Sequence, residues 1–323
     1  MILRLFYALI LALVAPCLHA VELPGIPQFM DEMVAKHGFE RGELEQIFGR
    51  AQHRQAIIDT ISKPATLKPW PEYRATFVND KRVAGGLQFW ALHADALRRA
   101  EQQYGVPQEI IVALIGVETL YGSNSGKHSV LDALVTLAFD YPRRAEFFRG
   151  ELEQYLLLAR EQKLDLFKVQ GSYAGAMGIP QFMPGSYRRY AVDFGGDGTA
   201  DLLHDPQDAI GSVANYLKQY GWSSGEPVTM PARTEEGADS SALAPGARAV
   251  AEWAAGGVRL ESTVAADKAA RLLTFTVTGG KELWLAFANF DVITRYNNSD
   301  FYAMTVYQLA EALRAARETG TQE

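Results

Sequence analysis

The segment Ile110-Ile-Val-Ala-Leu-Ile-Gly-Val117 decides the fold of this chain, because it is apolar on every side. It follows Val106-Pro107, and proline is favoured in the first turn of a helix. It ends at Tyr121-Gly122, where glycine favours a helix stop. A helix that is apolar on all faces is buried, so the sequence predicts a buried helix here.

Glu118 lies near the C-terminal end of this helix, where a negative charge is costly. Burial and the helix dipole both favour the protonated carboxyl, so we expect the pKa of Glu118 to be raised. A raised pKa would make Glu118 a proton donor at neutral pH. The alternative is a buried glutamate paired with an arginine or lysine.

The composition is that of a globular protein. The chain has 323 residues, of which 48% are hydrophobic and 21% charged. This length allows one large domain or two to three small ones. The net charge is −7 and there is no basic stripe, which argues against a nucleic-acid partner.

Residues 1–20 have the form of a secretory signal. Their apolar run, 5–14, is too short to span a bilayer comfortably. Cleavage before Val21 would release a periplasmic protein without cysteine, because Cys17 is the only one. A retained anchor is one alternative. An outer-membrane lipoprotein with lipid on Cys17 is another, but Pro16 replaces the small residue expected there.

The rest of the chain changes in character along its length. Residues 21–105 read as helices around an extended surface segment, Trp70-Pro71-Glu72-Tyr73. Residues 106–222 carry the strongest helix and turn signals, 223–287 read as a small β-domain, and 303–323 as a C-terminal helix. We expect helices at 29–36, 43–48, 52–61, 85–104 and 303–319, strands at 249–253, 258–263, 272–277 and 282–286, and a flexible loop at 237–246.

Residues 171–185 are rich in glycine and other small residues. Glycines let the backbone approach a ligand closely. Ser172 and Gln181 can bond to amide or hydroxyl groups. A structural turn explains any one of the glycines, but the whole stretch is better explained as a ligand-contact loop.

Residues 193–201 resemble a calcium-binding loop, in which oxygen ligands alternate around a glycine at the sixth position. Gly195 lacks the side-chain oxygen expected at the third position, and His204 replaces the glutamate expected at the twelfth. The alternative is an acidic turn without metal. The predicted ligands are Asp193, Asp197, Thr199 through its carbonyl, Asp201 and the later Asp208.

Five ordered motifs together resemble the lytic murein transglycosylase B family, over about residues 23–313. They are Gly116-Val-Glu-Thr-Leu-Tyr-Gly122, Asp140-Tyr-Pro-Arg-Arg-Ala-Glu146, Gly175-Ala-Met-Gly-Ile-Pro-Gln-Phe-Met-Pro184, Asp208-Ala-Ile-Gly-Ser-Val-Ala-Asn-Tyr216 and Thr294-Arg-Tyr-Asn-Asn-Ser-Asp-Phe-Tyr302. The resemblance implies a mainly α (α+β) fold, with a lysozyme-like core at 106–222 completed by 288–302. It also supports the calcium-type loop.

Such enzymes cut the glycan strands of peptidoglycan between N-acetylmuramic acid and N-acetylglucosamine, leaving a 1,6-anhydro end. The resemblance implies that Glu118 is the single catalytic acid and base, with no cofactor for catalysis. Ordinary glycosidases need two carboxyl groups. Asp132, Asp140 and Glu146 are as easily helix caps or ion-pair partners of Arg143 or Arg144.

The same resemblance implies which residues hold the sugar. The predicted substrate-binding residues are Ser172, Gln181, Tyr73, Tyr216, Tyr296 and Asn297. For each tyrosine the alternative is core packing with a bonded hydroxyl. Alternative functions are a hydrolytic muramidase and a non-catalytic peptidoglycan-binding protein. Cell-wall synthases are expected as further partners.

Overall fold

The computed structural model describes residues 23–63, 68–235 and 246–320. The signal predicted at 1–20 and nearly all of the loop predicted at 237–246 lie outside these residues. Contacts divide the chain into two units, 1–53 and 54–323, and each is described by itself. This division falls inside the predicted helical region 21–105, and the other predicted domain boundaries stay predictions.

The first unit is a helical pair, α1 (Ile26–His37) and α2 (Arg41–Arg50). Both helices were predicted, with shorter bounds. Their apolar faces meet at Phe29 and Phe48, whose rings pack edge to face with centroids 5.9 Å apart. Met33 is fully buried beside them.

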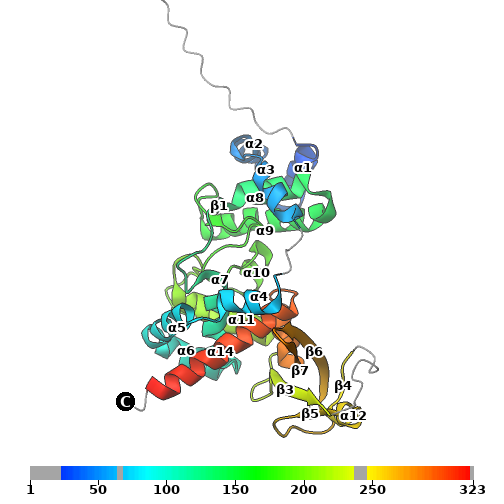
Figure 1. The fold of residues 1–323 in the computed structure, drawn as a ribbon. Coiled ribbons are helices and arrows are strands. Elements are labelled where there is room, and N and C mark those ends of the chain that lie inside the picture. Colours follow the sequence, from blue (N-terminus) through cyan, green and yellow to red (C-terminus); the bar gives the residue numbers. More distant parts are fainter. Residues whose placement is uncertain (1–22, 64–67, 236–245, 321–323) are drawn as a thin grey trace, which may run out of the picture. The chain divides into compact units, whose positions relative to one another are not determined.

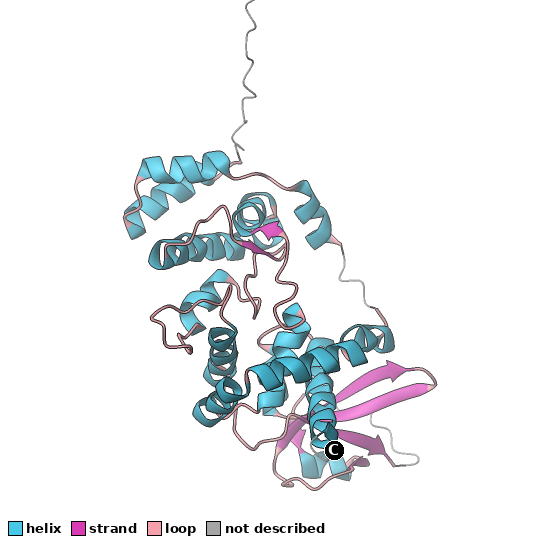
Figure 2. Cartoon of the chain, turned by 90° about the vertical axis from the view of Figure 1, so that its left-hand side faces the viewer, coloured by secondary structure: helices cyan, strands magenta, loops and turns pink. Residues whose placement is uncertain are grey.

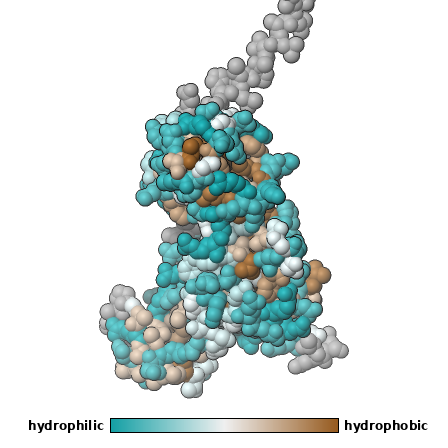
Figure 3. Space-filling view, turned by 180° about the vertical axis from the view of Figure 1, so that it is seen from behind, coloured by the Kyte–Doolittle hydropathy of each residue, from teal (hydrophilic) through white to brown (hydrophobic). Residues whose placement is uncertain are grey.

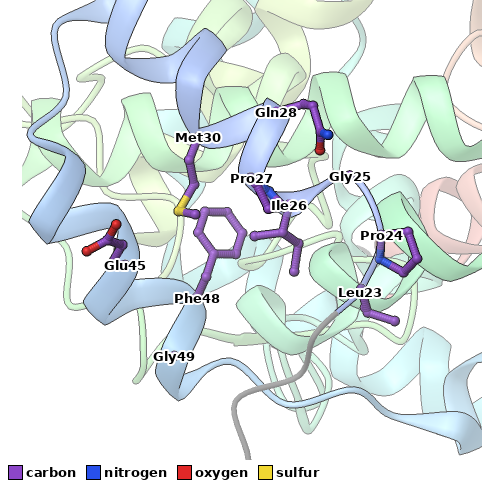
Figure 4. A pocket seen from close by; sticks show the side chains of 10 residues that line it. All are labelled: Leu23, Pro24, Gly25, Ile26, Pro27, Gln28, Met30, Glu45, Phe48 and Gly49. Atoms are coloured by element: carbon purple, nitrogen blue, oxygen red, sulfur yellow. The ribbon is translucent and has the colours of Figure 1, made fainter.

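An apolar pocket of about 580 Å³ opens in this first unit. Figure 4 shows Met30 and Phe48 pointing toward each other across it. The lining is Leu23, Pro24, Gly25, Ile26, Pro27, Gln28, Met30, Glu45, Phe48 and Gly49. It includes no residue that the sequence singled out for function.

The second unit is built around α7 (Gln108–Thr119), which packs against four other helices, α5, α6, α11 and α14 (Figure 1). Every residue from Ile110 to Val117 is buried, which confirms the predicted buried helix. The helices of this unit besides α7 are α3 (Gln55–Ser62), α4 (Trp70–Phe77), α5 (Asp80–Leu92), α6 (Ala94–Tyr104), α8 (Val130–Asp140), α9 (Ala145–Gln162), α10 (Pro184–Tyr190), α11 (Pro206–Gln219), α12 (Val250–Ala255), α13 (Ala288–Thr294) and α14 (Asp300–Gly320), with a 3₁₀ turn, η1, at Pro142–Arg144.

Five strands of the second unit form one antiparallel sheet beside the helices, which Figure 2 shows in magenta. Its order is β4-β6-β7-β3-β5, with a core that contains Trp253, Leu285 and Phe287. The strands are β3 (Thr229–Thr234), β4 (Arg248–Ala249), β5 (Val258–Leu260), β6 (Ala269–Val277) and β7 (Gly280–Ala286), and a separate pair joins β1 (His128–Ser129) to β2 (Gln170–Gly171). The predicted fold class, mainly helical with a small β region, is confirmed.

The prediction of an extended surface segment at 70–73 is wrong. These residues begin α4, with Pro71 in its first turn, where the missing N–H has no partner to lose. Trp70 is only 2% exposed. Its ring lies 4.6 Å from that of Phe275 and 5.2 Å from that of Phe301. Long-range packing on β6 and α14 therefore orders a segment that looked irregular locally.

Three other predicted elements also differ. The helix predicted at 85–104 is two helices, α5 and α6, which meet at His93. The strand predicted at 249–253 ends after Ala249 and continues as α12, with Trp253 in the core. The strand β3 was missed, because Pro231 interrupts its sequence signal.

Hydrophilic residues cover most of the face shown in Figure 3. Among the described residues, the large hydrophobic side chains that are exposed are Val34, Leu92, Phe147, Tyr173 and Tyr220. None of the helices in the described ranges combines the length and apolarity that crossing a membrane requires.

Candidate active site

Glu118 occupies the last turn of α7 and faces Tyr302 of α14. The Tyr302 hydroxyl donates a hydrogen bond to the Glu118 carboxylate. Tyr302 is 3% exposed, so this partner is held in place by packing. No lysine or arginine within the described ranges forms an ion pair with Glu118, so the alternative of a buried ion pair does not hold.

Burial raises the pKa of Glu118 to about 7, and the hydrogen bond from Tyr302 opposes part of that rise. The direction agrees with the prediction from the sequence. Glu118 nevertheless keeps some accessible surface. A carboxyl that is surrounded by protein but still reachable can exchange a proton with a ligand near neutral pH.

Tyr73 and Tyr296 lie near the same carboxylate. Burial raises the pKa of both tyrosines, and the negative charge of Glu118 raises it further. The Tyr296 and Tyr302 rings stack with centroids 6.5 Å apart. The structure thus brings residues of α4, α7 and α14, and of the turn before α14, into one aromatic cluster around the Glu118 carboxyl.

Tyr216 and Asn297 differ in how they relate to this aromatic cluster. Tyr216 is 5% exposed and its ring lies 4.8 Å from that of Tyr296. Its hydroxyl donates to the Arg295 carbonyl oxygen at 2.6 Å, which is a packed tyrosine with a bonded hydroxyl. Asn297 is exposed and follows Tyr296 directly.

The glycine-rich loop is fastened to the end of α7. The Thr119 hydroxyl donates to the Ile179 carbonyl oxygen at 2.8 Å and accepts the Gly122 N–H at 2.9 Å. The Tyr296 hydroxyl donates to the Pro180 carbonyl oxygen. The loop predicted to contact ligand therefore lies directly beside Glu118 in the structure.

Ser172 and Gln181 both organise this loop. The Ser172 hydroxyl oxygen accepts the N–H of Ala176 at 3.0 Å. Gln181 adopts a left-handed φ of 51°, and its amide donates to the carbonyl oxygens of Ser125 and Gly178, each at 2.9 Å. Both amide hydrogens are used in this way, which leaves the Gln181 carbonyl oxygen to accept from a ligand.

Gly178 shows why this loop needs glycine. Its φ is 77°, and a Cβ there would lie 2.4 Å from the Leu202 carbonyl oxygen. The next residue, Ile179, donates its N–H to the same carbonyl at 2.8 Å. The close approach joins the ligand-contact loop to the acidic loop that contains Leu202.

The acidic loop is organised by its own carboxylates. Asp193 accepts backbone N–H groups from Gly196, Asp197 and Gly198 at 2.6 to 3.1 Å. Asp201 accepts the N–H of His204 and bonds its Nδ1 atom at 3.0 Å. Asp193 and Asp201, two of the residues expected as calcium ligands, therefore hold a tight turn through their bonds to the backbone.

Asp208 is the most buried of these carboxylates, at 1% exposure. It accepts the N–H groups of Phe194 and Gly195 with one oxygen and that of Asp201 with the other, all at 2.7 to 2.8 Å. A Cβ on Gly195 would lie 2.9 Å from the Asp205 carboxylate. Within the described ranges, no three acidic or histidine side chains converge on one point where they could hold a metal ion.

Tyr302 and Thr119 were not among the predicted site residues. Tyr302 is separated from Glu118 by 184 positions, and no local pattern links them. It closes the motif 294–302, which was the one available signal. Asp132 forms an ion pair with Arg54 at 2.8 Å, a partner from a distant segment that the sequence did not suggest.

Comparison with known proteins places this chain in a family. Residues 23–311 match the model described as the transglycosylase SLT domain. The chain is 45% identical over 307 residues to the membrane-bound lytic murein transglycosylase B of Escherichia coli K12, covering 91% of this chain and 84% of the relative.

Solved structures of lytic transglycosylases are also similar to this chain. Soluble lytic transglycosylase SltB1 of Pseudomonas aeruginosa is 49% identical, with a TM-score of 0.86 over 91% of this chain and 100% of that one. Slt35 of Escherichia coli, solved in complex with calcium, is 45% identical, with a TM-score of 0.86 over 92% and 94%. SltB3 of Pseudomonas aeruginosa, in complex with NAG-anhNAM-pentapeptide, is 32% identical, with a TM-score of 0.81 over 90% and 78%. The chain therefore belongs to the transglycosylase SLT domain family, among the lytic murein transglycosylases that its motifs predicted.

Proposed function

We propose that this chain is a lytic transglycosylase of peptidoglycan in which Glu118 is the only catalytic acid and base. The observation that carries the proposal is the Glu118 carboxyl, reachable, bonded to Tyr302, and with its pKa raised to about 7. No aspartate or glutamate in the described ranges shifts that pKa. A two-carboxylate mechanism needs a second carboxyl group that flanks the scissile bond.

The reaction would proceed in two proton transfers. Protonated Glu118 gives its proton to the glycosidic oxygen between N-acetylmuramic acid and N-acetylglucosamine as that bond breaks. The acetamido group of the substrate stabilises the positive charge that develops at C1. The Glu118 carboxylate then takes the proton of the C6 hydroxyl as that oxygen bonds to C1, closing the 1,6-anhydro ring.

The surrounding residues would hold the substrate and the carboxylate. The Tyr302 hydroxyl stabilises the carboxylate after the first transfer. The Gln181 carbonyl oxygen and the Ser172 hydroxyl would bond the acetamido group and the sugar, as the family resemblance implies. Tyr73, Tyr216 and Tyr296 would line the sugar-binding cleft, with Asn297 as a polar partner, since aromatic faces pack well on sugar rings.

Product analysis tests this function. Sacculi are digested with the purified mature enzyme, and the released muropeptides are weighed by mass spectrometry. Anhydro ends are expected. Reducing ends would indicate a hydrolytic muramidase instead, and the absence of products would indicate a non-catalytic binding protein.

We also propose that the acidic loop binds calcium through Asp193, Asp197, Asp201, Asp208 and the Thr199 carbonyl. The tight turn, with Gly198 at a φ of 96°, fits such a loop, and the Slt35 complex contains calcium. The fit is partial, because the acidic side chains do not converge within the described residues. Any ion would stabilise the loop, and no step of the reaction uses it.

We further propose a periplasmic location, on the form of residues 1–20. N-terminal sequencing of the mature protein should give Val21, and a lipid-modified Cys17 would contradict it. A partnership with cell-wall synthases stays a prediction.

A further inference from the structure

The five-stranded sheet has two faces with different neighbours. Side chains alternate along a strand, so Arg271 and Phe275 of β6 share one face and Ala270 lies on the other. The face with Ala270 packs on Trp253 of α12. The face with Arg271 and Phe275 meets α4 and α14, which also bring tyrosines to Glu118. Neither Arg271 nor Phe275 was assigned a role by the sequence or by the site around Glu118.

Arg271 joins β6 to the segment that carries Tyr302. Its Nη1 and Nη2 atoms donate to the two carboxylate oxygens of Asp300 at 3.1 and 2.6 Å, and its Nε atom donates to Asp291 at 2.9 Å. Asp291 lies on α13, and Asp300 is the first residue of α14. One side chain of the sheet therefore holds the helices on both sides of the turn at 295–299.

The segment held in this way brings two tyrosines to Glu118. Tyr296 lies in the turn, and Tyr302 follows Asp300 by two residues. The Tyr302 hydroxyl donates to the Glu118 carboxylate. Burial, and then the charge of Glu118, raises the pKa of both tyrosines. A shift of Asp300 would therefore move the hydroxyl that stabilises the charged form of Glu118.

Phe275 supports the tyrosine that α4 brings to the same carboxylate. Its ring lies 4.6 Å from that of Trp70 on α4 and 5.8 Å from that of Phe301 on α14. The Tyr73 ring lies 5.6 Å from that of Phe301, and burial, followed by the charge of Glu118, raises the pKa of Tyr73. The same face of β6 therefore contacts both helices that carry these tyrosines.

The ion pairs of Arg271 are better suited to fixing geometry than to stabilising the fold. The side chains of Arg271, Asp291 and Asp300 are 27%, 51% and 44% exposed. Ion pairs with this much exposure contribute little to stability. A guanidinium that bonds both oxygens of one carboxylate nevertheless fixes the direction of that carboxylate as well as its distance.

We infer that Arg271 is a positioning residue of the reaction, and that the five-stranded sheet holds the segment 296–302 against Glu118. The inference rests on the proposed function and deepens it. Arg271 acts through Asp300 on the Tyr302 hydroxyl. When this anchor is lost, the hydroxyl donates to Glu118 less often, and the charged carboxylate loses stabilisation.

The pKa of Glu118, measured without turnover, tests the inference. Glutamate carboxyls are labelled with ¹³C and titrated by NMR, and the Glu118 signal is identified as the one missing from Glu118→Gln. Arg271→Gln should raise the pKa of Glu118 by about half a unit, because the hydrogen bond from Tyr302 is weakened and not removed. Arg271→Lys keeps one charge but not the planar fork, so its shift should be smaller. In the active enzyme, the alkaline limb of kcat/KM should move upward by the same amounts.

A double variant separates positioning from a general loss of stability. In Arg271→Gln/Tyr302→Phe the pKa of Glu118 should equal that of Tyr302→Phe alone, because Arg271 acts through that hydroxyl. Arg233→Gln is the matched control, since Arg233 lies on β3 of the same sheet and pairs with Glu261 at 2.9 Å. It should leave the pKa unchanged. An unchanged pKa in both Arg271 variants, or additive shifts in the double variant, would overturn the inference.

The proposed function is tested separately by the products of the unmodified enzyme. Anhydro ends together with an unchanged pKa in the Arg271 variants would refute the positioning role alone. A shifted pKa in a protein that releases no anhydro ends would refute the proposed function, and with it the role of Arg271 in the reaction, although the coupling of Arg271 to Glu118 would stand.

Discussion

Glu118 and Asp208 are two buried carboxyl groups with opposite hydrogen-bonding environments. Among the residues that the structure describes, the Tyr302 hydroxyl is the one donor to Glu118, and burial raises the pKa of Glu118 to about 7. Asp208 receives three backbone N–H groups, which oppose the rise in pKa that burial causes. A buried carboxyl with few hydrogen-bond donors keeps a raised pKa, so it can give and take a proton near neutral pH. A carboxylate that accepts several backbone N–H groups is stabilised in its charged form and holds chain segments together.

The largest expected effect is on the rate. Glu118→Gln keeps the shape of the side chain but cannot transfer a proton, so activity on peptidoglycan should fall by about 10³-fold or more. The loss exceeds that of a single acid or base because both transfers use this group. Release of anhydro muropeptides measures it, and near-normal turnover would reject Glu118 as the acid and base.

The same variant should be more stable than the unmodified enzyme at alkaline pH. The folded state holds a proton that the unfolded state loses at the ordinary pKa of 4.5, so stability falls as the pH rises from there to about 7. Above pH 7, the charged Glu118 lowers the free energy of unfolding by about 3 kcal/mol. Urea unfolding should therefore favour Glu118→Gln by about that amount at pH 8. The two proteins should converge near pH 4; a constant difference would contradict the raised pKa.

Removing the Asp208 carboxyl should destabilise the folded protein. Asp208→Ala leaves three backbone N–H groups without an acceptor, and the free energy of unfolding should fall by about 3 kcal/mol. Asp197→Ala is the matched control, because Asp197 is exposed and accepts only the Thr199 N–H in the structure. Both are measured with a chelator present. Equal losses of unfolding free energy in the two variants would show that the buried Asp208 carboxylate stabilises the fold no more than the exposed Asp197 carboxylate does.

Calcium should stabilise the loop by a smaller amount that depends on its concentration. Binding to the folded state alone adds about 2.7 kcal/mol at a hundredfold excess over Kd, and less at lower excess. Millimolar calcium should therefore raise the melting temperature, magnesium should do much less, and Asp197→Ala should abolish the rise. An unchanged melting temperature after thorough chelation would leave the loop as an acidic turn.

The smallest effect concerns the single donor of Glu118. Tyr302→Phe removes a hydrogen bond that stabilises the charged carboxylate, so the pKa of Glu118 should rise further, by about one unit. The falling limb of kcat/KM at alkaline pH should move upward by the same amount. Tyr307→Phe, on the same helix but packed beside Trp284, should leave the limb in place. An unmoved limb in Tyr302→Phe would show that the hydroxyl does not tune Glu118.

The buried helix around Glu118, its raised pKa and the small β region could be predicted from the sequence, because each depends on neighbours along the chain. A continuous apolar run forces burial wherever the helix lies. The motifs also identified the family, and with it Ser172, Gln181 and the tyrosines as candidates. The predicted ligand-contact role of the glycine-rich loop agrees with its position beside Thr119.

Only the tertiary structure decided which residues meet. Tyr302 reaches Glu118 across 184 positions because α14 packs on α7. Trp70 begins a helix because Phe275 and Phe301 bury its ring. Asp208 joins separate segments by accepting three backbone N–H groups, and Tyr216 does so by packing on Tyr296. Local pattern fixes what a residue prefers, whereas packing between distant segments fixes its partners and therefore its protonation.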